Sequence, residues 1–384
     1  MLYFGLRIKH TVLLLLFTRL SKFIVVLFLG VCMRLAVWPI LAGIALGVIA
    51  PLLVSLGNPG NMGVCAACFT RDIAGGLNLH QAAVVQYIRP EIIGLVIGAL
   101  VASFAFGEFR PRAGSAPVVR FMLGVFAMIG ALVFLGCPWR MWLRFSAGDF
   151  TSIAGIFGLV CGILIGIFFL KRGFSLGRSY ATSKIVGFIF PLFMVGLFGL
   201  LIWGLLDVEA PIKFSQKGPG SQHAPLIISL VAGLFLGAIF QKSRFCMIAA
   251  VRDSVLLKDT HILQGVIALV IAAFLTNLAL GYFNPGFSGQ PIAHNEWVWN
   301  FLGMLLSGFA FSLAGGCPGR QLVLSGEGDS DAGVFVFGLL MGAAFAHNFG
   351  LASSPAGIGV NAPIAVFVGI VFCLLVAIFA RERR

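Results

Sequence analysis

The chain has 384 residues, of which 60% are apolar and 10% are charged, and its mean hydropathy is +1.05. Soluble domains carry about 25% charged residues, so this composition excludes a water-soluble protein and indicates a lipid surrounding. The net charge of +13 does not indicate nucleic-acid binding, because basic residues in short loops orient a membrane protein.

Residues 1–34 form an N-terminal extension or an extra helix of unassigned status. The apolar run from Thr11 to Gly30 contains Arg19 and Lys22, and charges near the centre of a membrane span are costly. An interfacial helix, an extra span and a leader all stay open as interpretations, with Met33 as an alternative start.

Ten apolar segments of spanning length follow and predict transmembrane helices. The first five lie near residues 35–56, 91–107, 118–136, 151–170 and 186–206, and the second five near 225–240, 262–282, 297–315, 332–351 and 362–380. We therefore expect an all-α integral membrane protein.

Two motifs occur twice, in the same order and at nearly the same offset. A Cys followed after five residues by Arg-Asp occurs at 65–72 and 246–253, and 246 − 65 = 181. Gly-Cys-Pro-x-Arg occurs at 136–140 and 316–320, where the cysteines differ by 317 − 137 = 180. This duplication predicts a first repeat at 35–206, a linker at 207–224 and a second repeat at 225–384.

Five spans in each repeat force the two repeats into opposite orientations. Sorting the loops alternately by side gives six basic residues on one side and fifteen on the other, so the second side and the C-terminus are predicted to be cytoplasmic. Residues 57–72 and 241–256 are too short and too interrupted to span, which predicts re-entrant half-helices, the first turning from Met62. These should enter from opposite faces and meet near the midplane, where such proteins bind substrate.

The cysteines are the candidate site. Three of the eight, Cys32, Cys161 and Cys373, lie in apolar runs outside the motifs and are interpreted as packing residues. A thiol is a weak donor and a polarisable acceptor, which suits a soft anion, and helix N-termini favour negative charge. The predicted substrate path contains Cys65, Cys68, Cys137, Cys246 and Cys317, with supporting charge from Arg71, Asp72, Arg140, Arg252, Asp253 and Arg320.

Other roles for these residues stay open. The motif cysteines could be packing residues, the Arg-Asp pairs could fasten loops, and Asp149 and Asp329 are interpreted as caps. Cys65 and Cys68 have the spacing of a zinc or redox pair, but Ala249 replaces the second cysteine in the other repeat, so no metal or cofactor is expected. A membrane thiol–disulfide oxidoreductase using Cys65 and Cys68 is the competing function.

Around these residues the chain resembles the YeeE/YedE family of membrane transporters. The run 65–76, with Gln86–Glu91 and Gly136–Arg140, is similar to the YedE branch linked to selenium metabolism. The resemblance implies an hourglass-like inverted-repeat fold, thiosulfate import in some members, and passage of the ion by S–H···S contacts at Cys65, Cys137 and Cys317, with Cys246 as the symmetry mate of Cys65.

We therefore expect a non-enzymatic transporter or channel-like facilitator in a bacterial-type inner membrane. Its expected substrate is a small selenium species, with thiosulfate or a related sulfur compound as the alternative. The expected partners are this soft chalcogen anion and the lipid bilayer, with a cytoplasmic selenium- or sulfur-carrier protein left open and no nucleic acid.

Overall fold

The computed structural model describes residues 36–207 and 209–380. The extension at 1–34, including Cys32, lies outside the described residues. The elements are, in order, α2 (Val37–Ser55), α3 (Ala66–Gly76), α4 (Pro90–Ala105), β1 (Arg112–Ala113), α5 (Pro117–Phe134), α6 (Pro138–Ser146), α7 (Ser152–Lys171), β2 (Tyr180–Ala181), α8 (Lys184–Leu206), a 3-10 turn (Pro219–Ser221), α9 (Leu226–Ser243), α10 (Met247–Leu256), α11 (His261–Ala279), α12 (Trp297–Ala314), α13 (Pro318–Gly326), α14 (Ser330–Asn348) and α15 (Ala362–Phe379).

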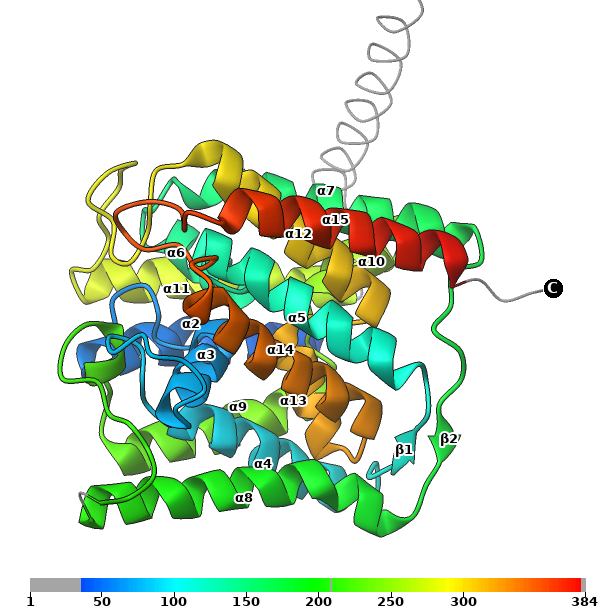
Figure 1. Cartoon of the computed structure of the whole chain (residues 1–384), viewed down its shortest axis with the longest axis horizontal. Helices are drawn as coiled ribbons and strands as arrows, with labels where there is room; N and C mark the ends of the chain where they lie inside the picture. The colour runs from blue at the N-terminus through cyan, green and yellow to red at the C-terminus, as the bar shows by residue number, and fades with distance from the viewer. Residues whose placement is uncertain (1–35, 208, 381–384) are drawn as a thin grey trace, which may run out of the picture.

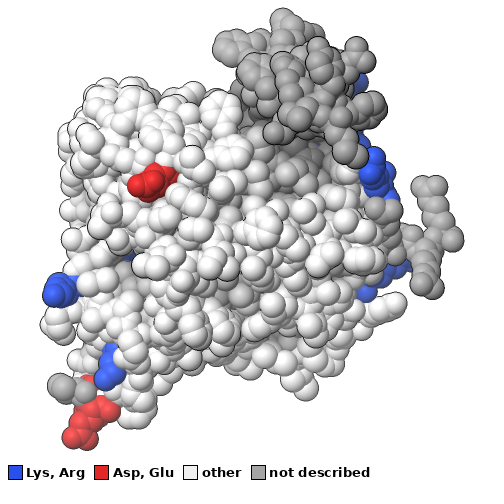
Figure 2. Space-filling model, turned by 45° about the horizontal axis from the view of Figure 1, so that its top comes forward, with Lys and Arg blue, Asp and Glu red and all other residues white. Residues whose placement is uncertain are grey.

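The fold is that of an all-α integral membrane protein, as predicted. Within 36–207 and 209–380, nine helical segments are long and apolar enough to cross a membrane, and α4 is a shorter apolar helix of 16 residues. Each of the ten predicted spans corresponds to one long helix. Figure 2 shows a face with few Lys, Arg, Asp or Glu side chains, most of which lie towards its left and right edges. This distribution suits a protein whose sides face lipid.

The long helices run across the view of Figure 1, and most of the connections gather at its two ends. At the left lies the segment that joins α8 to α9, and we name this end the linker face. At the right lie β1, which pairs antiparallel with β2, and the end of α15. We name this end the C-terminal face.

The helix packing repeats itself when each helix is exchanged for its counterpart in the other half. Helix α4 packs along α9 just as α2 packs along α11, and α5 packs along α14 just as α7 packs along α12. Glycines allow these close approaches: a Cβ on Gly98 would lie 2.0 Å from the Leu234 carbonyl oxygen, and one on Gly43 would lie 1.9 Å from that of Gly265. The last helices differ in part, since α8 packs on α4, α13 and α14 whereas α15 packs on α12, α5 and α7.

This pairing supports two repeats divided at the α8–α9 linker. The exact boundaries, the inverted orientation, the hourglass shape and the cytoplasmic location of the C-terminal face stay predictions.

In the part of the chain that the structure describes, four short helices interrupt the bundle, two in each half. They are α3, α6, α10 and α13, with 11, 9, 10 and 9 residues. The expected start of the first at Met62 was wrong. The chain stays irregular up to Cys65, where the side-chain amide of Asn58 donates a hydrogen bond to the Gly63 carbonyl at 2.9 Å. The helix then runs from Ala66 to Gly76.

Each Gly-Cys-Pro motif follows a span and begins a new helix, because Pro138 and Pro318 each occupy the first position of a short helix. Proline suits that position, since its missing N–H has no helical acceptor there and its fixed φ is already helical.

Candidate functional site

Each of the four short helices begins at a motif cysteine. The N-cap residues of α3, α6, α10 and α13 are Cys65, Cys137, Cys246 and Cys317, each with extended backbone angles. All four side chains are at most 3% exposed. An N-cap lies at the positive end of the helix dipole, beside N–H groups that have no intrahelical acceptor. The four cysteines therefore mark four buried positions that favour negative charge.

The cysteines lie as two pairs, one from each repeat. The sulfurs of Cys65 and Cys137, the first thiol pair, are 3.6 Å apart. Cys246 and Cys317, the second thiol pair, lie close enough that each side chain affects the other's thiol. All of these thiols are free. The sequence placed these residues on one path, and the structure brings them together two by two.

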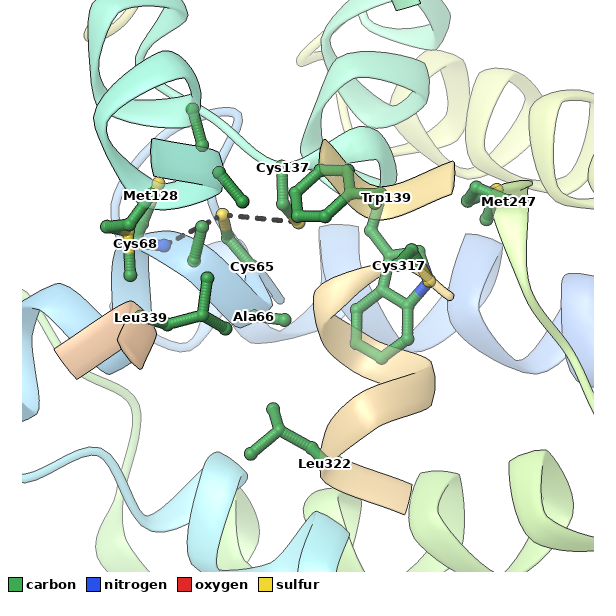
Figure 3. Packing of buried hydrophobic residues seen from close by; sticks show 14 of the residues in the cluster. Cys65, Ala66, Cys68, Met128, Cys137, Trp139, Met247, Cys317, Leu322 and Leu339 are labelled. Carbon is green, nitrogen blue, oxygen red and sulfur yellow. Dashed lines mark hydrogen bonds between the residues drawn. The ribbon is translucent and has the colours of Figure 1, made fainter. Parts of the chain in front are cut away.

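Cys68, whose role the motif symmetry left open, lies beside the first thiol pair. We name Cys65, Cys68 and Cys137 together the first cluster. The backbone N–H of Cys68 donates to the Cys65 sulfur at 3.2 Å, and its own sulfur lies 4.0 Å from the Leu135 carbonyl oxygen. Figure 3 shows Cys68, Cys65 and Cys137 following one another across the view. The first repeat thus has three neighbouring thiols and the second repeat has two.

Backbone amides surround these sulfurs. The Cys65 sulfur accepts a hydrogen bond from the backbone N–H of the residue three positions later, which is the usual bond of a helix N-cap. The sulfurs of Cys137, Cys246 and Cys317 lie near the equivalent amides of their own helices, although those contacts miss the geometry of a capping bond. Each thiol therefore shares its position with a donor that an anion could also use.

Arg140 carries its charge directly into the first cluster. It is completely buried, and its guanidinium lies 3.6 Å from the Cys68 sulfur. The remaining contacts are to carbonyl oxygens, those of Asn61 and Ile292 at 3.0 Å and that of Leu135. Within the described residues no carboxylate pairs with it. An isolated buried cation attracts an anion strongly.

Its counterpart Arg320 is arranged differently. The Arg320 guanidinium pairs with Glu327 at 3.0 Å, and Glu327 also binds Arg244 at 3.0 Å. The two motif arginines thus differ in charge compensation, although the sequence gives them equivalent positions.

The Arg-Asp pairs also differ between the repeats. Asp72 binds Arg71 at 2.6 Å and Arg89 at 2.8 Å, and all three side chains are at most 3% exposed. Arg89 continues to the linker, donating to the carbonyls of Pro219 and Gln222. The pair Arg252–Asp253, in contrast, is 28% and 20% exposed. Both ion pairs hold neighbouring residues together. In the first, Asp72 balances only one of the two arginines that it binds, so one positive charge near the thiols has no counter-ion.

One cavity is lined by a motif thiol, and a smaller one lies beside a partner of Arg140. A cavity of about 620 Å³ is lined by Cys246 together with Lys242, Arg244, Arg252 and Arg320. A smaller cavity of about 160 Å³ lies where α2 and α11 end, and is lined by Asn61, whose carbonyl binds Arg140. Asp253 and Asp259 also line the larger cavity, so its surface is basic on balance and reaches Cys246 of the second thiol pair.

Some residues of the site were not identified from the sequence. Arg89 sits outside the motifs, and Glu91 is buried with one oxygen bound by Asn58 at 2.8 Å and Ser229 at 3.0 Å. Trp139 was quoted only as a motif position, yet its ring lies beside Cys317 in Figure 3. The signal that could have found it is Gly319, which stands at the same place in the second motif.

The remaining predictions fall on ordinary positions. Cys373 is buried on α15, and Cys161 lies partly buried on α7, both outside the thiol clusters. Asp329 is the N-cap of α14, where its carboxylate accepts the Ala332 amide, and Asp149 accepts that of Thr151. Asp329 therefore agrees with its interpretation as a cap. Asp149 holds the loop before α7, whose N-cap is Thr151, and also pairs with the buried Arg144 at 2.7 Å.

Comparison with known proteins supports a relation to sulphur transport. Residues 242–381 match the family model described as sulphur transport. The matched region contains the second copies of both motifs and runs from the end of α9 through α15, and it supports the resemblance to the YeeE/YedE family. No curated protein matches the chain. A multi-pass membrane protein related to sulphur transporters is therefore the description that these findings support.

Proposed function

We propose that the protein moves a small, soft sulfur anion across the membrane through the two thiol pairs. The observation that carries this proposal is the position of the four motif cysteines, each buried at the start of a short helix and in contact with the cysteine of a second short helix. Packing alone would not require four thiols at equivalent N-caps. A path for an anion benefits from each of them.

The charges of the first cluster favour an anion over a neutral substrate. Arg140 has no carboxylate partner in the described structure, and Asp72 balances only one of Arg71 and Arg89. Helix N-termini add dipoles of the same sign. An anion entering this region therefore replaces water with donors that are already oriented, which lowers the desolvation barrier.

Thiosulfate is the substrate that this arrangement fits best. Its terminal sulfur is soft and suits thiol contacts, while its oxygens accept hydrogen bonds from amides and guanidinium groups. The sequence expectation of a selenium species rests on the similarity to the YedE branch, and the matched family model concerns sulphur. We propose import towards the C-terminal face, with that face cytoplasmic in an inner membrane.

Uptake into proteoliposomes tests the proposal. Purified protein should admit labelled thiosulfate faster than protein-free vesicles, and labelled sulfate should enter far more slowly because it lacks the soft sulfur. Selenite and selenide in the same assay decide the selenium alternative. Equal uptake of sulfate and thiosulfate would remove the argument from thiol contacts.

The oxidoreductase alternative is tested by trapping thiols. A redox cycle through Cys65 and Cys68 requires a disulfide between them during turnover, whereas the path uses free thiols throughout. Alkylation followed by mass spectrometry during uptake separates the two. A carrier protein that receives the anion at the basic cavity stays a proposal, and co-purification with a sulfur-carrier protein would test it.

A further inference from the structure

The symmetry of the site is broken between the two thiol pairs. Trp139 and Gly319 occupy the same place in the two Gly-Cys-Pro motifs, two residues after Cys137 and Cys317. A Cβ on Gly319 would lie 1.9 Å from Cζ2 of the Trp139 indole. The tryptophan therefore fills the space that a side chain at the second position would need. One repeat supplies a large ring, and the other supplies the room for it.

The indole is completely enclosed. Trp139 is 1% exposed, and its ring centre lies 5.0 Å from that of Phe240. Its side chain starts on the helix that begins at Cys137, and its ring reaches the helix that begins at Cys317, where Figure 3 shows it beside Cys317. An anion passing from the first thiol pair to the second would have to move this side chain or pass along its edge.

The polar atom of this ring has no partner. Among the described residues, nothing accepts a hydrogen bond from the Trp139 Nε1–H. The neighbouring ring atom, Cε2, lies 2.6 Å from the Cβ position of Gly319, so the N–H lies against the first turn of α13. A buried donor without an acceptor is costly and is rare in native proteins. Here it lies beside amides that also lack an intrahelical acceptor.

We propose that Trp139 is both the barrier between the two thiol pairs and a hydrogen-bond donor that recognises the anion on its way between them. An indole N–H donates and cannot accept, so it selects a substrate that has oxygen acceptors. The substrate class is thus an anion that combines oxygen acceptors with a soft sulfur. This inference rests on the proposed function and adds the residue that selects the oxygen end of the substrate.

The test separates the ring from its N–H. Trp139→Phe keeps an aromatic barrier and removes the donor, and Trp139→Ala removes both. Trp142→Phe is the matched control, since Trp142 lies on the same helix. Thiosulfate binding is measured by titration calorimetry of purified protein, and uptake of thiosulfate and sulfate is measured in vesicles.

We expect Trp139→Phe to weaken thiosulfate binding about tenfold or more, as for loss of a bond to a charged group, and still to exclude sulfate. Trp139→Ala should admit sulfate, because without the ring the opening is wide enough for an anion to cross without thiol contacts, and Trp142→Phe should behave as wild type. If Trp139→Phe fails to fold, Gly319→Ala displaces the same ring from the opposite side and should weaken binding likewise.

Two results would overturn the inference while leaving the proposed function standing. Wild-type affinity in folded Trp139→Phe removes the role as donor, and exclusion of sulfate by Trp139→Ala removes the role as barrier. A wild-type protein that neither binds nor transports thiosulfate or another sulfur anion refutes the proposed function itself, and this inference with it.

Discussion

Replacing Asp72 by asparagine should destabilise the protein far more than the same change at Asp253. Asp72 accepts two bonds from Arg71, at 2.9 and 2.6 Å, and one from Arg89 at 2.8 Å, all from buried groups. Removing the carboxylate charge leaves two buried guanidinium groups without a counter-ion, and breaking a buried ion pair costs about 3–5 kcal/mol. The Arg252–Asp253 pair is 28% and 20% exposed, so the matched change should cost about 1 kcal/mol or less.

Thermal unfolding of the two purified variants in detergent measures the difference. The linker provides a second readout, because Arg89 also holds the carbonyls of Pro219 and Gln222. Asp72→Asn should therefore expose residues 209–224 to protease, whereas Asp253→Asn should not. Equal unfolding midpoints for the two variants would refute the argument that burial makes the ion pairs of Asp72 more stabilising than the ion pair of Asp253.

Two further predictions concern charge and orientation. Arg140→Gln should raise the thiosulfate concentration for half-maximal uptake about tenfold or more, because it removes the isolated buried charge. Arg140→Lys keeps a positive charge and should recover part of the loss. An unchanged concentration for Arg140→Gln would refute the electrostatic argument. Single cysteines placed in loops 108–116 and 283–296 should be labelled from opposite sides of the membrane by an impermeant maleimide. Labelling from the same side would contradict the inverted repeats.

The sequence was sufficient to predict the ten long helices, because the apolar spans are long and the loops between them are polar. Helix α7, for example, was expected at 151–170 and occurs at Ser152–Lys171. The duplicated cysteines could be predicted as the candidate site because a motif repeated in the same order is a signal that does not depend on the fold.

The asymmetry of the site could not be read from the same pattern. Arg140 and Arg320 occupy equivalent motif positions, yet Glu327 pairs only with the second. Partners of this kind come from loops outside the motifs, where the repeats have diverged. The short helices α6 and α13 are not among the elements predicted from the sequence. Each has only nine residues and begins at the proline that directly follows a span.

The central claim is that the motif thiols carry the substrate, and uptake by serine variants tests it most directly. Serine keeps the size and a hydroxyl donor but replaces the soft sulfur with a harder, better hydrated oxygen. With rates normalised to folded protein, we expect Cys137→Ser and Cys317→Ser each to lose most thiosulfate uptake in proteoliposomes, and Cys161→Ser and Cys373→Ser to retain it. Wild-type rates for both Cys137→Ser and Cys317→Ser would contradict the claim and leave these cysteines as packing residues.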